Sequence, residues 1–192
     1  MRIVREVVED EVVAAFLRGE LASSRYGEKL RGLLGGETEL VERPDLADAS
    51  ANRRRRALLD EHRAFERRKG LFAGFPERVD WFRAALTRAE LLSILYIDWD
   101  WWLELSGGTR RPSDAAERIR RGAVEGVTAE EHEPFVRAVS DLIVVGRPGG
   151  ARLVLLEGHV RLTACALFPE RLPDELELYL GLAEDIERWS LF

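Results

Sequence analysis

The chain has 192 residues, of which 46% are hydrophobic and 33% are charged, and its formal net charge is −6. This composition is typical of a folded globular protein, and the length suits one compact domain or a small domain with a helical extension. The negative charge gives no global reason to expect a nucleic-acid partner. The single cysteine excludes an internal disulfide, and no long apolar segment predicts a membrane span or a membrane partner. We therefore expect a cytoplasmic protein.

The N-terminal part is predicted to be helical. Apolar residues recur with a helical period over residues 3–34, and Gly35 with the following glycine ends this pattern. A second helix is predicted over residues 52–68, and a short one over residues 79–86. We place the boundary of this helical section at residues 1–86.

Basic residues gather in the helix predicted over residues 52–68, between Arg53 and Lys69. Such a run can follow the phosphates of a nucleic acid. The run also contains acidic residues, and a charged helix face is more often simply solvated. Nucleic acid is therefore an open alternative as a partner but not the favoured one.

The segment over residues 91–122 combines aromatic, acidic and flexible stretches. Trp99, Trp101 and Trp102 lie within four positions, a clustering more typical of a core than of a ligand platform. Acidic residues beside them are candidates for a metal ligand or a base: Asp98, Asp100 and Glu104.

A loop over residues 106–111 follows, with hydroxyls, two glycines and two arginines. Loops of this kind can surround a phosphate with backbone N–H groups, although this one lacks the lysine of a P-loop. The alternative is a plain turn. The candidate binding residues are Gly107, Gly108, Thr109 and Arg110.

A strand-to-helix turn is predicted around Gly158. The apolar run over residues 153–156 predicts a strand buried on both faces, and a helical pattern begins just after His159. The first turn of a helix offers unpaired N–H groups and a positive dipole end, which together bind anions. Arg161 and Glu157 are four residues apart, so Arg161 can hold a phosphate while Glu157 holds a metal or accepts a proton. The alternative is a simple ion pair across one turn.

The remaining elements complete an α+β pattern. We predict a helix over residues 127–141, a hairpin formed by residues 142–145 and 152–156, and a strand over residues 175–180. Cys165 lies among small apolar residues and is expected to be buried and unreactive.

The run LIVVGRPGGARLVLLEGHVRLTACALFPERLPDELELYLG, residues 142–181, resembles the core of the ParB/sulfiredoxin-like superfamily. This superfamily includes the N-terminal domain of ParB partition proteins, the sulfiredoxins and the free serine kinases. Its members share a hairpin, a glycine-containing turn with a basic pair, a helix ending in small residues and a returning strand. In this resemblance Arg161 matches the phosphate-contacting arginine, and Gly158 and His159 match the turn. Sulfiredoxins have a catalytic cysteine where this chain has Gly158, which argues against sulfiredoxin chemistry.

The resemblance implies that residues 87–192 form a small mixed sheet with helices, preceded by the helical section. It also implies a nucleotide site for ATP or another NTP with Mg²⁺, in a cleft where the loop over residues 106–111 faces the turn. Arg110 or Arg111 would then be the arginine of the superfamily's first conserved box. NTP hydrolysis or phosphoryl transfer to a small-molecule acceptor would follow.

The resemblance implies that Glu157 is a metal ligand. It also implies that the catalytic group is Glu157, Asp98 or Asp100. Two alternatives stay open. The first is a DNA-binding or partition-type regulatory module that uses a nucleotide as a switch. The second is a scaffold that has kept the fold and lost the chemistry, because a fold does not fix a function.

Overall fold

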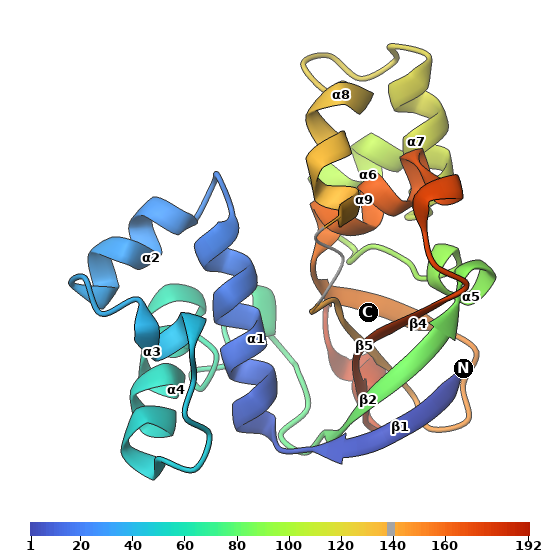
Figure 1. Cartoon of the computed structure of the whole chain (residues 1–192). Coiled ribbons are helices and arrows are strands. Elements are labelled where there is room, and N and C mark those ends of the chain that lie inside the picture. Colours follow the sequence, from blue (N-terminus) through green and yellow to red (C-terminus); the bar gives the residue numbers. More distant parts are fainter. Residues whose placement is uncertain (138–140) are drawn as a thin grey trace.

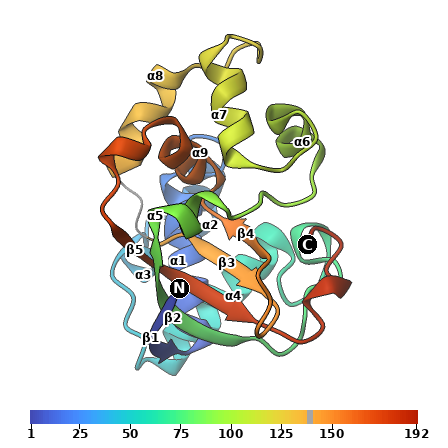
Figure 2. The ribbon, with the colours of Figure 1, turned by 90° about the vertical axis from the view of Figure 1, so that its right-hand side faces the viewer.

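The computed structural model describes residues 1–137 and 141–192. It shows an α+β fold in which a five-stranded mixed sheet carries helices on both faces (Figures 1 and 2). The strand order is β1-β2-β5-β3-β4, with β5 and β3 parallel and the other neighbours antiparallel. The strands are β1 (Arg2–Val7), β2 (Asp80–Thr87), β3 (Ile143–Gly146), β4 (Leu153–Glu157) and β5 (Glu175–Leu182).

The helices form two groups, one on each side of the sheet (Figure 1). The N-terminal group contains α1 (Glu9–Ala22), α2 (Gly27–Leu34), α3 (Glu39–Glu42) and α4 (Ala49–Arg63). The second group contains α5 (Arg88–Leu92), α6 (Asp100–Ser106), α7 (Pro112–Arg120), α8 (Ala129–His132) and α9 (His159–Leu167). Short 3₁₀ turns are η1 (Gly70–Phe72), η2 (Glu133–Arg137), η3 (Pro169–Arg171) and η4 (Ile186–Arg188). Within these described residues, no helix is long and apolar enough to cross a membrane.

The sheet divides the hydrophobic core into two parts, because side chains alternate along each strand. In β4, Val154 and Leu156 pack against the N-terminal helices, whereas Leu155 packs against the α9 side. The three side chains are 0–4% exposed. The predicted strand buried on both faces is thereby confirmed.

Two predicted helices are partly or wholly strands. The start of the pattern over residues 3–34 lies in β1, and residues 79–86 largely coincide with β2. β2 pairs with β1 on one side and along its whole length with β5 on the other. Short apolar runs fit both periods, so these long-range pairings decide the structure. The section over residues 1–86 is therefore not a separate helical unit, since it supplies strands to the common sheet and its boundary falls inside β2.

Other boundaries agree with the sequence. The Asp48 side chain caps α4 by accepting two backbone N–H groups, and Gly35 ends α2 in the left-handed conformation. The hairpin of β3 and β4 is confirmed, and β5 contains the strand predicted over residues 175–180. The helix predicted over residues 127–141 is shorter, because α8 passes into η2, and residues 138–140 lie outside the described part of the chain.

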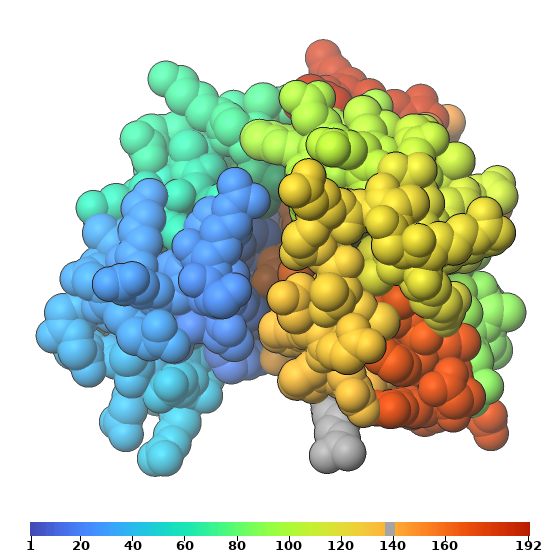
Figure 3. Space-filling view, turned by 90° about the horizontal axis from the view of Figure 1, so that it is seen from above, coloured from blue at the N-terminus to red at the C-terminus, as the bar shows by residue number. Residues whose placement is uncertain are grey.

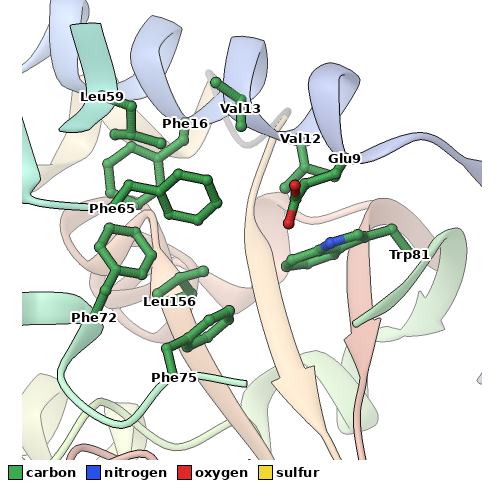
Figure 4. A pocket seen from close by; sticks show the side chains of 10 residues that line it. All are labelled: Glu9, Val12, Val13, Phe16, Leu59, Phe65, Phe72, Phe75, Trp81 and Leu156. Atoms are coloured by element: carbon green, nitrogen blue, oxygen red, sulfur yellow. The ribbon is translucent and has the colours of Figure 1, made fainter. Parts of the chain in front are cut away.

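An aromatic cluster joins the N-terminal helices to the tail of the chain. Phe72 packs edge-to-face on Phe65 and Phe75, and Phe75 packs in the same way on Trp189, with ring centroids 4.9 to 5.5 Å apart. Figure 4 shows the three phenylalanines around a small cavity of about 20 Å³ beneath α1. The Trp189 indole donates to the Leu71 carbonyl at 2.7 Å, so the tail is docked onto the body.

We expect Trp189→Ala to lower the free energy of unfolding by about 3–5 kcal/mol, because Trp189 is 2% exposed and its removal leaves a cavity. Trp101→Ala is the matched control, since Trp101 is 40% exposed and its loss should change stability by less than about 1 kcal/mol. Urea denaturation of both variants measures the difference. Equal effects would contradict the anchoring role of the tail.

Candidate functional site

The candidate site is the turn between β4 and α9. Gly158 is the N-cap of α9 and has φ +104°, a conformation that side chains rarely adopt. A Cβ atom there would also overlap the Leu142 side chain. Glycine is therefore required both for the backbone conformation and for the close packing of the turn.

An ion pair lies directly on this turn. The Arg161 guanidinium donates to Glu157 Oε2 at 2.7 Å, and the two side chains are only 14% and 12% exposed. α1 passes over the pair at Gly19, where a Cβ atom would overlap Glu157 Oε1 and lie 2.9 Å from Arg161 Nη2. The N-terminal helices thus cover the pair, and a glycine inside α1 makes this approach possible.

A second buried group of charges from α1 and α4 stands beside the pair. Glu20 accepts from Arg63 at 2.6 and 2.7 Å and lies 2.8 Å from His62 Nε2. The Arg63 guanidinium also lies over the Tyr26 ring, 3.7 Å from its centroid. Both Glu20 and Arg63 act electrostatically on Glu157. The site is therefore built from both halves of the chain.

The buried carboxyl of Glu157 has an unusual pKa. Burial raises the pKa of Glu157 to about 7, the positive Arg161 opposes this shift, and the negative Glu20 adds to it. A carboxyl that titrates near neutral pH is suited to accept or donate a proton in a reaction.

His159 lies in an aromatic stack. Its ring packs on Trp102 with a centroid distance of 4.6 Å and an interplanar angle of 20°, and Tyr96 packs on the same tryptophan at 5.0 Å. Burial lowers the pKa of His159 to about 3, and its buried Nε2 has no hydrogen-bond partner within the described residues. His159 is therefore neutral at pH 7, and the positive charges near the turn belong to Arg161 and Arg63.

The loop over residues 106–111 does not face the turn as predicted. Arg110 donates to the backbone carbonyls of Tyr96, Leu191 and Phe192 at 2.8 to 3.1 Å, and Arg152 donates to the same Phe192 carbonyl. This places the Arg110 guanidinium at the start of β4, whereas the turn follows the end of β4. Arg110 therefore anchors the tail and is not a phosphate ligand.

The other residues of this loop close the end of α6. Gly107 is the left-handed C-cap and Gly108 also has a positive φ, while the Thr109 hydroxyl donates to the Ser106 carbonyl. These contacts are those of a plain turn, the alternative interpretation of the sequence.

The candidate acidic residues after β2 lie on the surface. Asp98, Asp100 and Glu104 are exposed, and the backbone N–H of Asp98 donates to the Leu191 carbonyl near the tail. Trp99 and Trp101 are 47% and 40% exposed, so these two tryptophans are not core residues as predicted.

A metal site is not preformed in the part of the chain that the structure describes. Across residues 1–137 and 141–192, no group of three His, Cys, Asp or Glu residues is placed to hold a metal ion. The carboxylate of Glu157, the predicted metal ligand, faces Arg161 instead.

A surface groove lies between the two helical groups. Figure 3 shows it between the blue segment of α1 and α2 and the yellow-to-orange segment of α8 and η2. α9 packs against both α8 and η2, and the residues at its start contact Gly19 of α1. The start of α9 thus contacts elements on both sides of this groove.

Several basic residues of α4 and of the turn after it are engaged within the protein. Ion pairs of 2.5 to 2.9 Å join Arg54, Arg56, Arg63 and Arg67 to acidic residues, and the buried Arg55 donates to two backbone carbonyls. This pairing reduces the positive charge that the helix offers to nucleic acid.

Sequence reasoning found Glu157 and Arg161 but missed Glu20, His62 and Arg63. The available signal was Glu20, a carboxylate on the apolar face of α1. No protein-family model, curated protein or solved structure matches the chain. The ParB/sulfiredoxin-like resemblance accordingly stays a prediction that rests on residues 142–181.

We expect Gly19→Ala to destabilise the protein by about 1–3 kcal/mol, because the added methyl group meets the buried pair. Gly32→Ala is the control. Gly32 also lies inside a helix, but no described atom is within 4 Å of its Cβ position, so alanine should stabilise by about 0.5–1 kcal/mol. Urea denaturation should therefore show changes of opposite sign in the free energy of unfolding for the two variants. A Gly19→Ala variant more stable than the parent would refute the close contact.

We expect acid to destabilise the parent partly through His159. The unfolded chain takes up a proton near pH 6.5, whereas the folded chain does so only near pH 3, so stability is lost as the pH falls through this window. His159→Phe keeps a ring on Trp102 but removes the titration. Between about pH 6.5 and pH 4 the variant should lose less stability than the parent, by up to about 1.4 kcal/mol per pH unit. The measurement is the free energy of unfolding in urea at several pH values. If this free energy changes with pH equally in both proteins, the assignment to His159 is wrong.

Proposed function

We propose that the protein binds a nucleoside triphosphate, with ATP as the first candidate, and catalyses its hydrolysis or the transfer of a phosphoryl group to a small molecule. The observation that carries this proposal is the largely buried Glu157–Arg161 pair at the start of α9, next to Gly19 of α1. A helix start, an arginine and a carboxyl that titrates near neutral pH are the parts that phosphoryl chemistry uses.

Each group has a role in this proposal. Gly158 lets the backbone approach the phosphates, and the first N–H groups of α9 with Arg161 bind their oxygens. Glu157, whose pKa lies near neutral pH, is the group that exchanges a proton during the reaction. Arg63, held on α4 by its pair with Glu20, lowers the pKa of Glu157 from outside the turn. Mg²⁺ would arrive on the phosphates of the nucleotide, and it adds charge neutralisation there.

We propose in addition that the fold is ParB/sulfiredoxin-like. The hairpin β3–β4, the glycine turn, α9 and the returning strand β5 follow one another in the order that the resemblance implies. The mixed sheet with helices on both faces supports this proposal. Under it, Arg161 corresponds to the phosphate-contacting arginine of the superfamily.

We expect ATP with Mg²⁺ to raise the melting temperature of the protein, because a ligand at a hundred times its Kd adds about 2.7 kcal/mol of stability. CTP, GTP and UTP, each with and without Mg²⁺, establish the base preference. Arg161→Ala should abolish the rise, and Arg161→Lys should weaken it because lysine lacks the planar fork. The release of inorganic phosphate tests turnover in the same samples.

The control is Arg171→Ala, which removes an arginine whose side chain is 40% exposed and which pairs with Glu133 away from the turn. It should respond to nucleotide like the parent. If Arg161→Ala responds like the parent too, the site assignment is wrong. If no nucleotide stabilises the parent, nucleotide binding itself is wrong, and a fluorescent duplex at low salt then tests the DNA-binding alternative against the scaffold.

A further inference from the structure

We infer that nucleotide binding at this site is coupled to the uptake of one proton by Glu157, because the phosphate and the Glu157 carboxylate compete for Arg161 in a confined space. This inference rests on the proposed function and adds to it the charge state in which the site binds its ligand.

The geometry leaves the carboxylate little room to withdraw. Arg161 holds Glu157 Oε2 at 2.7 Å, and the backbone of α1 at Gly19 closes the side of Oε1. A phosphoryl oxygen that binds Arg161 would therefore come close to an ionised carboxylate. Two negative charges this close are strongly unfavourable in a poorly solvated place, as in paired carboxyl groups that share one proton.

The surrounding charges favour Glu157 as the group that takes the proton. Arg161 acts on it from α9, Glu20 from α1 and Arg63 from α4, whereas the neighbouring His159 ring packs on Trp102. His159 is neutral, and the Arg63 guanidinium is already engaged by Glu20, so neither is available to hold a second anion. In the free protein burial already raises the pKa of Glu157 to about 7, so protonation requires little free energy at neutral pH.

The terminal phosphate of the nucleotide is the other possible proton acceptor. Its last pKa lies near about 6, and binding to Arg161 and to a helix start lowers it further. The proton therefore comes from solvent and stays on the carboxyl oxygen of Glu157. A neutral Glu157 is then a hydrogen-bond donor to the phosphate, and it becomes a base only after it has lost this proton.

The experiment measures the enthalpy of ATP·Mg²⁺ binding by calorimetry in two buffers of different ionisation enthalpy, and the difference gives the number of protons taken up. A pH of about 8 is used because the free nucleotide is already deprotonated there. With a pKa of about 7, about nine-tenths of Glu157 is ionised in the free protein, so an uptake of about 0.9 proton per nucleotide is expected. The affinity of the parent should fall about tenfold per pH unit between about pH 7.5 and pH 9.

Glu157→Gln provides the matched comparison, because glutamine keeps the shape and carries no charge. It should bind with an uptake near zero and an affinity that does not change over the same pH range. Glu187→Gln, the same substitution at an exposed position, should behave like the parent. If Glu157→Gln does not fold, the buffer dependence of the binding enthalpy of the parent decides by itself whether a proton is taken up.

The outcomes separate the two proposals. Binding to the parent without proton uptake would overturn the coupling and leave the nucleotide site intact. Uptake that persists in Glu157→Gln would move the proton to another group and would also overturn it. No binding to the parent would overturn the proposed function, and the coupling with it.

Discussion

The structure depends on the close contact between α1 and the turn that joins β4 to α9. At this contact the backbone of Gly19 touches the buried pair of Glu157 and Arg161, and the next residue, Glu20, begins a second buried set of charges. Charges removed from water are tolerated only when partners surround them. The two helical groups therefore meet here through a close backbone contact, and charged side chains from both groups lie beside it.

This arrangement gives the N-terminal helices a chemical role in addition to a structural one. Glu20 and Arg63 tune the protonation of Glu157 from outside the turn, although they contact neither Gly158 nor the phosphate position that we propose. The turn by itself would have a more solvated carboxylate with an ordinary affinity for protons. The properties of the site thus belong to the assembled fold and not to the short motif.

The sequence allowed the C-terminal elements and part of the site to be predicted. Continuous apolar runs around a Gly-Gly turn leave few alternatives to a hairpin. The four-residue spacing of Glu157 and Arg161 predicted that they would meet, and they do so across the strand-to-helix turn rather than along a helix. β1 and β2 could not be assigned, because their strand character comes from pairing with each other and with β5, far away in the chain. His62 was missed for a similar reason, since its partner Glu20 lies on another helix.

The strand order also determines when the molecule can fold. β5, the last strand in the chain, occupies the centre of the sheet between β2 and β3. Neither outer pair of strands can join the other until β5 has left the ribosome, and both hydrophobic cores use side chains from β5. The sheet is consequently assembled only after β5 has been synthesised, and its many non-local contacts favour slow folding. Until then the apolar faces of the early helices are exposed, which favours aggregation of the partly folded chain.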